Sequence, residues 1–266
     1  MAADPEYTLV LGLDRRHLRQ LQIVWPTWRR HKPSITEVPL LIFYDHAEID
    51  EYDIRQVTKR TEDAIYFPWP CPGVHYDGDP ASKWYHPQRY KMLAGFVHVP
   101  ALHCLTEYYL KIDTDAVAMG QPDWIDPRWF ENDPSIIAPP WGYCKPADQI
   151  DRLDDWVRQH KETIYHLARY EPLRMHARPG SDMVRCERII SNVAFFNTAF
   201  TKFASKWANQ TCGEHKLPVP SQDGYLWYLA RRQGLLVRRV PMKPRGWQVW
   251  NTEANIKQAA ITAMET

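Results

Sequence analysis

At the middle of the chain stands the stretch Tyr108-Tyr-Leu-Lys-Ile-Asp-Thr-Asp-Ala-Val-Ala-Met119. Its β-branched and aromatic residues predict a buried strand that leads into two aspartates one residue apart. Because side chains alternate faces in an extended backbone, Asp113 and Asp115 are expected to point the same way and Thr114 the opposite way. Two neighbouring carboxylates repel each other, so we expect a divalent cation to hold them. Oxygen-only ligation favours Mg²⁺ or Mn²⁺ over zinc.

The segments before this stretch alternate between strand and helix patterns. Apolar runs predict strands at residues 8–13, 38–44 and 64–67, the last stopped by Pro68. Helices are expected at 15–25, interrupted by Pro26, and at 51–60 and 87–97. This alternation is typical of an α/β fold with a mostly parallel sheet and helices on both faces. Ligands of such sheets bind at the carboxyl ends of strands, where this chain places Asp14, Asp45, Asp113 and Asp115.

The second half of the chain continues with both patterns. Strands are expected at residues 134–138, 188–196 and 235–240. Helices are expected at 148–169, after the cap residues Asn197 and Ser221, and from residue 251 or 252 to the end. No internal repeat and no low-complexity linker divides the chain, so we expect one domain with two lobes.

Composition excludes several classes of protein. The chain has 266 residues and a net charge of +1, which gives no electrostatic reason to expect a nucleic-acid binder. It has no Gly-x-Gly-x-x-Gly and no Walker loop, which argues against a dinucleotide enzyme or a P-loop NTPase. Glycine is scarce at 11 and tryptophan abundant at 12, and flat aromatic faces suit sugar rings as well as protein cores.

The cellular location is also constrained by the sequence. The five cysteines are odd in number and widely spaced, which fits a reducing compartment. No apolar stretch approaches the roughly 20 residues of a membrane span, and the first residues carry no secretory signal pattern. We therefore expect a cytoplasmic protein without a transmembrane segment. The basic N-terminal region leaves a peripheral membrane position open.

Three segments, in this order, resemble the GT-A glycosyltransferases that use nucleotide-sugar donors. Tyr109-Leu-Lys-Ile-Asp113-Thr-Asp115 looks like the Asp-x-Asp (DxD) strand of that family. Ser191-Asn-Val-Ala-Phe-Phe-Asn197-Thr198 is similar to the strand and helix start that face the acceptor. Ser221-Gln222-Asp223-Gly224 is similar to the acidic helix N-terminus near the reacting sugar. The resemblance covers roughly residues 8 to 250, and the order and spacing of the motifs carry most of its weight.

The resemblance implies a GT-A-like, Rossmann-like fold in a single domain of residues 1–266. The donor half would be about residues 1–120, the acceptor half about 121–250, and the C-terminal helix 251–266. It implies a metal-dependent enzyme that moves a sugar from a UDP- or GDP-sugar to a hydroxyl of a glycan or glycoconjugate. Members often supply a third metal ligand, a histidine, from the C-terminal region. No histidine follows His215 here, so that ligand is water, a donor phosphate or another residue.

The resemblance also assigns roles to the acidic residues. Asp115 is the surer direct ligand of Mn²⁺ or Mg²⁺, and Asp113 is expected to contact the donor ribose or metal-bound water. Asp223 is the candidate catalytic carboxylate. In an inverting transfer it would be the base for the acceptor hydroxyl, and in a retaining one it would hold the acceptor or the reacting sugar, or act as nucleophile. Structural capping of its helix is the alternative role.

Basic residues are candidates for contacts with the donor diphosphate. Arg89 and Lys91 lie in the helix before the aspartate pair. Lys91 is expected either to reach a phosphate or to form a salt bridge on the helix face. Lys243 and Arg245 lie in a C-terminal loop that resembles the lids folding over the diphosphate, with an ordinary surface loop as the alternative.

Two other functions fit the same residues. Ile112-Asp-Thr-Asp-Ala-Val117 also resembles the Asp-x-Asp-x-(Thr/Val) loop of haloacid-dehalogenase-type phosphatases, in which the first aspartate is the nucleophile and the second an acid/base. That family usually carries the loop on its first strand, whereas about four strand–helix units precede it here. The second alternative is a non-catalytic nucleotide- or carbohydrate-binding relic of the GT-A fold.

Overall fold

The computed structural model describes residues 6–60, 62–69, 91–140, 143–144, 159–160, 175–177, 180, 184–186, 189–210 and 222–266. The Pro-rich loop after residue 69, Arg89 and the cap residue Ser221 lie outside the described residues. The predicted helix at 148–169 also lies outside them, apart from residues 159–160, which are helical.

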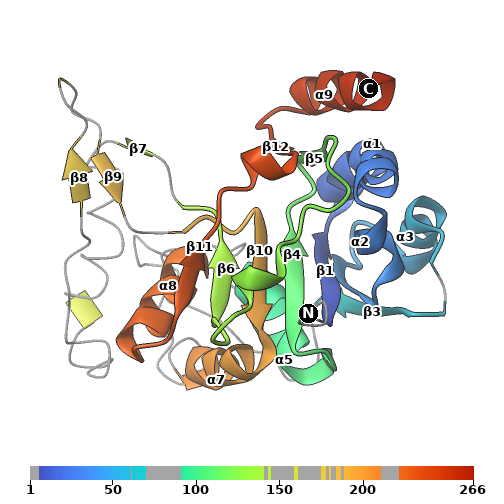
Figure 1. Cartoon of the computed structure of the whole chain (residues 1–266). Helices are drawn as coiled ribbons and strands as arrows, with labels where there is room; N and C mark the ends of the chain where they lie inside the picture. The colour runs from blue at the N-terminus through green and yellow to red at the C-terminus, as the bar shows by residue number, and fades with distance from the viewer. Residues whose placement is uncertain are drawn as a thin grey trace.

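A seven-stranded sheet forms the centre of the molecule (Figure 1). Its strands follow the order β11-β6-β10-β4-β1-β2-β3. All neighbours run parallel except β10, which is antiparallel to both β4 and β6. The bounds are β1 Tyr7–Leu13, β2 Leu40–Asp45, β3 Ala64–Trp69, β4 Tyr108–Ile112, β6 Ile136–Ala138, β10 Val193–Asn197 and β11 Val237–Arg239. From β1 to β3 the chain builds outward to one edge, whereas on the other side the later strand β10 is inserted between β4 and β6.

The central strands are apolar on both faces because both faces are covered. In β1, Leu9 and Leu11 pack into one hydrophobic cluster, and Val10 packs into the other. In β4, Leu110 packs into the same cluster as Leu9 and Leu11, and Tyr109 packs into the same cluster as Val10. Such near-continuous apolar strands are what a buried, mostly parallel sheet requires. The alternating strand and helix patterns of the sequence therefore predicted the class of fold correctly.

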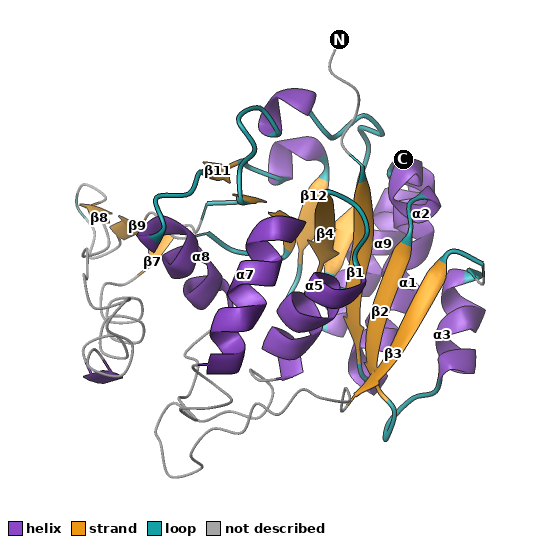
Figure 2. Ribbon diagram, turned by 90° about the horizontal axis from the view of Figure 1, so that it is seen from below, coloured by secondary structure: helices purple, strands orange, loops and turns teal. Residues whose placement is uncertain are grey.

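Helices pack on both sides of the sheet (Figure 2). One side carries α1 Arg15–His31, α2 Pro33–Glu37, α3 Glu51–Thr58 and the C-terminal α9 Glu253–Glu265. The other carries the π-helical turn η1 Ala94–His98, which continues into α5 Val99–His103, together with α7 Thr198–Ala208 and α8 Gln222–Arg232. The side-chain caps expected from Asp14 and Asn197 are present. In the part of the chain that is described, no helix combines the length and the apolar character needed to cross a membrane.

Two proline predictions are wrong. Pro26 was expected to end the first helix, but α1 continues through it to His31. Pro26 and Gln22, four residues earlier, are both exposed, so water can bond the carbonyl that loses its partner, while buried Trp25 and Trp28 hold the helix to the core. Pro68 was expected to stop the third strand, but β3 runs on to Trp69. It lies at the sheet edge, where a missing N–H is tolerated.

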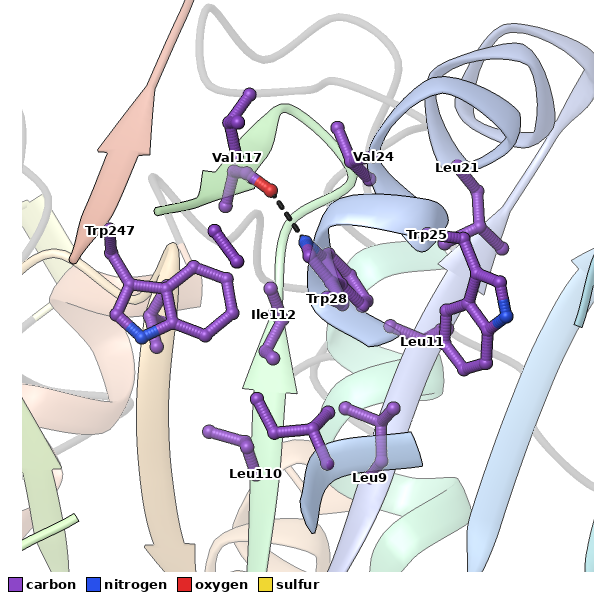
Figure 3. Close-up of a cluster of buried hydrophobic side chains, with 14 of the residues drawn as sticks. Leu9, Leu11, Leu21, Val24, Trp25, Trp28, Leu110, Ile112, Val117 and Trp247 are labelled. Carbon is purple, nitrogen blue, oxygen red and sulfur yellow. Dashed lines mark hydrogen bonds between the residues drawn. The ribbon is translucent and has the colours of Figure 1, made fainter. Parts of the chain in front are cut away.

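A short antiparallel pair that the sequence did not reveal lies beside the aspartates. β5 (Ala116–Ala118) pairs with β12 (Trp247–Val249), which follows the 3₁₀ turn η5 Lys243–Arg245. The indole of Trp28 donates to the carbonyl oxygen of Ala116 at 2.7 Å, shown as the dashed line in Figure 3. The ring of Trp247 packs edge-on to Trp28 at 6.0 Å between centroids. Helix α1 thus fixes the backbone directly after Asp115.

The remaining described elements are small. The expected strand at 235–240 is real but shorter, because β11 spans only Val237–Arg239. A separate three-stranded sheet consists of β7 Tyr143–Cys144, β9 Val184–Cys186 and β8 Met175–Ala177. The 3₁₀ turn η2 (Pro127–Trp129) follows β5 and is capped by the side chain of Asp126.

We predict that Gly246→Ala destabilises the protein far more than Gly234→Ala. Both glycines have positive φ, +77° and +67°. A Cβ at Gly246 would lie 2.0 Å from the carbonyl oxygen of Met119, whereas one at Gly234 would meet nothing within 4 Å. Strain from φ alone costs about 1–2 kcal/mol, and we expect Gly246→Ala to cost at least about 2 kcal/mol more because backbone must move. Urea unfolding measures both, and equal losses would refute the close approach of β12 to β5.

Candidate functional site

The aspartate pair lies at the carboxyl end of β4, as the sequence predicts, but not in extended backbone. β4 ends at Ile112, and the chain turns so that the N–H of Ala116 donates to the carbonyl oxygen of Asp113 at 3.0 Å. The expected extended backbone is therefore wrong at Thr114 and Asp115, which lie in a turn. Both carboxylates nevertheless border one cavity of about 120 Å³, and Thr114 borders it too. We call this the aspartate cavity.

The wall opposite the pair comes from the first turns of α1. Arg16, His17 and Gln20 line the aspartate cavity, and Gln20 accepts a hydrogen bond from the hydroxyl of Thr114 at 2.8 Å. The N-terminus of α1 carries the positive end of a helix dipole, and Arg16 adds a full positive charge. The lining of the cavity thus combines two carboxylates with positive potential from α1 and Arg16, an arrangement that can hold a cation and an anion together.

Asp113 is held by a buried lysine. The side chain of Lys111 is only 2% exposed, and its ammonium nitrogen Nζ lies 2.5 Å from Oδ1 of Asp113. The same nitrogen donates to the carbonyl oxygen of Ser191 at 2.6 Å and lies 4.7 Å from the centre of the Phe96 ring. A buried cation needs such partners, because desolvation otherwise costs several kcal/mol. Asp113 is therefore a fixed, charge-paired carboxylate.

Asp115 is the less satisfied member of the pair. Its Oδ1 is buried and has no hydrogen-bond partner among the described residues. Burial first, and then the charge of Asp113, raises the pKa of Asp115 to about 6. An orphaned carboxylate oxygen beside a second carboxylate is the donor set that a hard divalent cation prefers. The residues present therefore fit Mn²⁺ or Mg²⁺, although within the described ranges no group of three histidine, cysteine or acidic side chains surrounds such an ion.

Asp223 connects to the pair through Ser191. It lies in the first turn of α8, and its Oδ2 accepts the backbone N–H of Ser191 at 3.2 Å. Its Oδ1 accepts the hydroxyl of the same serine. Since Ser191 also accepts from Lys111, a continuous chain of contacts runs from Asp113 to Asp223. The structure thus brings together the three acidic residues that the sequence selected from segments more than 100 residues apart.

The predicted basic residues lie at separate positions around the aspartate pair and do not form one cluster. Lys91 forms an ion pair with Asp45 at the end of β2, with 2.5 Å between Nζ and Oδ2, so its salt-bridge alternative is the one seen. Asp14, at the end of β1, is also near this lysine. Burial opposes ionisation of Asp14, but hydrogen bonds from the side chain and backbone of His17 outweigh it and lower its pKa to about 2. Arg89 remains a prediction outside the described residues.

Lys243 and Arg245 lie in the walls of two different hollows. Lys243 borders a hollow of about 600 Å³, which we call the tryptophan hollow, formed by Pro139, Pro140, Asn192, Val193, Pro241, Met242, Lys243 and residues 247–250. This hollow adjoins the pair, because the Asn192 carbonyl oxygen accepts from the N–H of Asp113 at 2.7 Å. Arg245 borders a second hollow of about 700 Å³ instead.

Sequence reasoning missed the residues that organise the site. Lys111 was the detectable one, because a lysine inside an apolar strand and two positions before Asp113 must be paired if it is buried. Ser191 and Gln20 gave no such signal, because single polar residues in these segments are common. Trp250 acts through its backbone N–H, which donates to the carbonyl oxygen of Asp115 at 3.2 Å, and no side-chain pattern could reveal that.

The fold matches those of solved glycosyltransferases. Core-mannan synthase A from Aspergillus fumigatus, in its form with Mn and GDP, matches over 88% of this chain and 71% of its own, with 12% identity and a TM-score of 0.53. Mouse xyloside xylosyltransferase 1, in its apo form, matches over 90% of this chain and 85% of its own, with 8% identity and a TM-score of 0.51. No protein-family model and no curated protein sequence matches the chain. The expected GT-A fold is confirmed.

We predict that Asp115→Asn stabilises the metal-free protein at neutral pH. The pKa of Asp115 is raised to about 6, so the folded chain retains a proton between about pH 4 and 6 that the unfolded chain releases. Stability from this group is present below pH 4 and lost as pH rises through 6. With a chelator, the variant should gain about 1–2 kcal/mol at pH 7.5 and nothing at pH 4. Urea unfolding at several pH values measures this, with the exposed Asp123→Asn as control. A gain independent of pH would contradict the raised pKa.

Proposed function

We propose that this chain is a metal-dependent glycosyltransferase that moves a sugar from a nucleoside-diphosphate sugar to a hydroxyl acceptor. The donor would be a UDP- or GDP-sugar and the acceptor a glycan or glycoconjugate. The observation that carries the proposal is the buried oxygen of Asp115, which has no partner among the described residues and lies beside Asp113 at the carboxyl edge of a GT-A sheet. The fold alone would not support it, since one fold hosts many functions.

A bound Mn²⁺ or Mg²⁺ would neutralise charge on the departing diphosphate and help to position the donor. In this proposal Asp115 is the direct ligand. Asp113, already paired with Lys111, faces the donor ribose or metal-bound water. The positive wall of the aspartate cavity, with Arg16 and the N-terminus of α1, attracts phosphate oxygens. The third ligand is left to water, a phosphate oxygen or another residue.

Among the predicted basic residues, Lys243 suits the diphosphate best. It lines the tryptophan hollow. The walls of this hollow include Asn192 and Trp250, whose backbones form hydrogen bonds with those of Asp113 and Asp115. Lys91 supports the site indirectly, because it holds Asp45 at the neighbouring strand end. Arg245 is engaged in the other hollow, and Arg89 keeps its predicted role. Of the two tryptophans that line the tryptophan hollow, Trp247 is 2% exposed and packs in the core, so the half-buried Trp250 is the one proposed to pack against a sugar ring.

Asp223 is proposed as the carboxylate that acts on the acceptor side. Ser191 holds both of its oxygens, which fixes their direction and still leaves lone pairs, because an ionised carboxylate has about four acceptor positions. In an inverting reaction Asp223 takes the proton of the acceptor hydroxyl as the new bond forms. In a retaining reaction it holds the acceptor or the reacting sugar, or acts as nucleophile. The donor half about 1–120 and acceptor half about 121–250 belong to the same proposal.

We predict that Asp115→Asn removes metal-dependent donor binding. The amide keeps the size of the side chain but loses the charge that attracts a cation, so affinity for UDP or GDP in the presence of Mn²⁺ should fall at least about tenfold. Isothermal titration calorimetry with and without Mn²⁺ measures this, and Asp123→Asn is the matched surface control. Unchanged affinity in the Asp115 variant would remove it from the metal site. Hydrolysis of nitrophenyl phosphate by the wild type would instead favour the phosphatase.

We predict that Asp223→Asn keeps donor binding and loses transfer. Asparagine can still accept from Ser191 through its amide oxygen, so the helix start should hold its position. Loss of a general base typically costs about 10²–10⁴-fold in rate. The measurement is release of nucleoside diphosphate from UDP- and GDP-sugars with Mn²⁺, beside calorimetric binding of the same nucleotides. Wild-type turnover in the variant would exclude a catalytic role, and loss of binding as well would indicate a structural one.

A further inference from the structure

A second hollow, whose lining includes four arginines, lies next to the tryptophan hollow. It has a volume of about 700 Å³ and shares Pro241 with its neighbour. The segment after Pro241 therefore sends Lys243 to one hollow and Arg245 to the other. We call it the arginine hollow, and its charged lining is Asp126, Arg128, Glu131, Arg238, Arg239 and Arg245.

The charge of the arginine hollow is unlike that of the whole molecule. Four arginines and two acidic residues line the arginine hollow, whereas the complete chain carries a net charge of only +1. A concave surface lined by one sign of charge focuses its field and concentrates ligands of the opposite sign. The imbalance is therefore a feature of this hollow and not a consequence of a basic protein.

The carboxylate of Asp126 contacts two of the arginines. Arg128 donates to both oxygens of Asp126, with 2.6 Å from Nη2 to Oδ2 and 3.0 Å from Nε to Oδ1. Arg245 approaches the same Oδ2 at only 3.6 Å and lies over the ring of Trp129, 5.2 Å from its centre. The side chain of Arg128 is 78% exposed. Asp126 thus holds two guanidinium groups together, and among the described residues several of their N–H groups have no further acceptor.

Arg238 adds an unused donor. Its Nη2 donates to the carbonyl oxygen of Glu131 at 2.6 Å, but its buried Nε has no partner among the described residues. Burial of an N–H donor without an acceptor is unfavourable, and an anion could relieve this once the side chain moves to expose Nε. The guanidinium fork matches a carboxylate or phosphate, which can accept two parallel N–H groups.

We propose that the arginine hollow binds a carboxylate or phosphate group of a carbohydrate. Resting on the proposed function, we further infer that this carbohydrate is the acceptor, which makes the acceptor class an acidic glycan. Its charged group would sit among the arginines while a neighbouring sugar reaches the tryptophan hollow across Pro241. A hollow of this volume suits one or two sugar units better than the flat surface of a membrane.

The test measures binding in the absence of donor and metal, by calorimetry at 50 mM and 300 mM salt. The probes are a tetrasaccharide containing uronic acid, a neutral tetrasaccharide of equal length, and inorganic phosphate. We expect the acidic tetrasaccharide to bind at least about tenfold more tightly than the neutral one, with weaker binding at high salt. Equal affinities for the two tetrasaccharides would overturn the proposal.

Two variants with opposite expected effects locate the binding. The double change Arg128→Gln, Arg245→Gln should lower affinity for the acidic tetrasaccharide about tenfold, and Lys202→Gln, on the exposed face of α7, should leave it unchanged. Asp126→Asn keeps the oxygen that caps η2 but removes the competing charge, so it should raise affinity about threefold or more. A purely structural ion cluster would instead give lower affinity in both variants, and that result would refute the site.

Further outcomes separate this inference from its alternatives. Sedimentation with phosphatidylglycerol vesicles tests a lipid source of phosphate, and arginine-dependent vesicle binding without tetrasaccharide binding would overturn the carbohydrate assignment. Failure of the nucleotide-binding tests together with intact tetrasaccharide binding would refute the transferase and leave the hollow standing. If transfer is observed, Asp126→Asn should lower the KM for an acidic acceptor and leave kcat unchanged. An unchanged KM would show that the arginine hollow does not bind the acceptor during the reaction.

Discussion

The contact between Lys111 and Asp113 is the constraint on which the rest of the site depends. A lysine that is 2% exposed is stable only where partners replace its hydration, and here they are one carboxylate, one carbonyl oxygen and one aromatic ring. The carbonyl belongs to Ser191, which precedes β10, so the ammonium joins β4 to its antiparallel neighbour. Removing Asp113 would leave the buried ammonium of Lys111 without its carboxylate, which is destabilising, although the loss is smaller than for a fully buried pair because Asp113 is 33% exposed.

The ion pair between Lys111 and Asp113 gives the two aspartates different roles. Lys111 offsets part of the charge of Asp113, while burial first and the remaining repulsion from Asp113 second raise the pKa of Asp115 to about 6. Asp113 is thus held in place, and Asp115 keeps an oxygen without a hydrogen-bond partner in the described part of the chain. The pair also stands beside β1, where the chain turns from building one half of the sheet to building the other, which is the switch point at which open α/β sheets bind ligands.

The sequence predicted the strands and helix caps that local residue patterns determine. It did not predict the features that contacts between distant segments determine. Strand β4, the cap residues Asp14 and Asn197, and the strand ends that carry aspartates all follow from hydrophobic period and capping chemistry. The turn after Asp113 and the pairing of β5 with β12 were not predictable, because backbone bonds to segments about 130 residues later decide them. The same limit applies to Lys91, whose two candidate partners could only be separated by its position beside Asp45.

A second buried lysine shows that the Lys111 arrangement is not isolated. Lys32 is fully buried, and its ammonium group donates to the carbonyl oxygens of Met119, Gly120 and Gln121. Burial lowers its pKa to about 8, so most of the group is still protonated at neutral pH. It fixes the loop after β5, where Gln121 borders the arginine hollow, and it lies beside Gly246. Two internal ammonium groups therefore hold the backbone on either side of β5. Lys111 contacts Asp113 before β5, and Lys32 holds residues 119–121 after it. The geometry of the candidate site thus depends on side chains that lie wholly inside the protein.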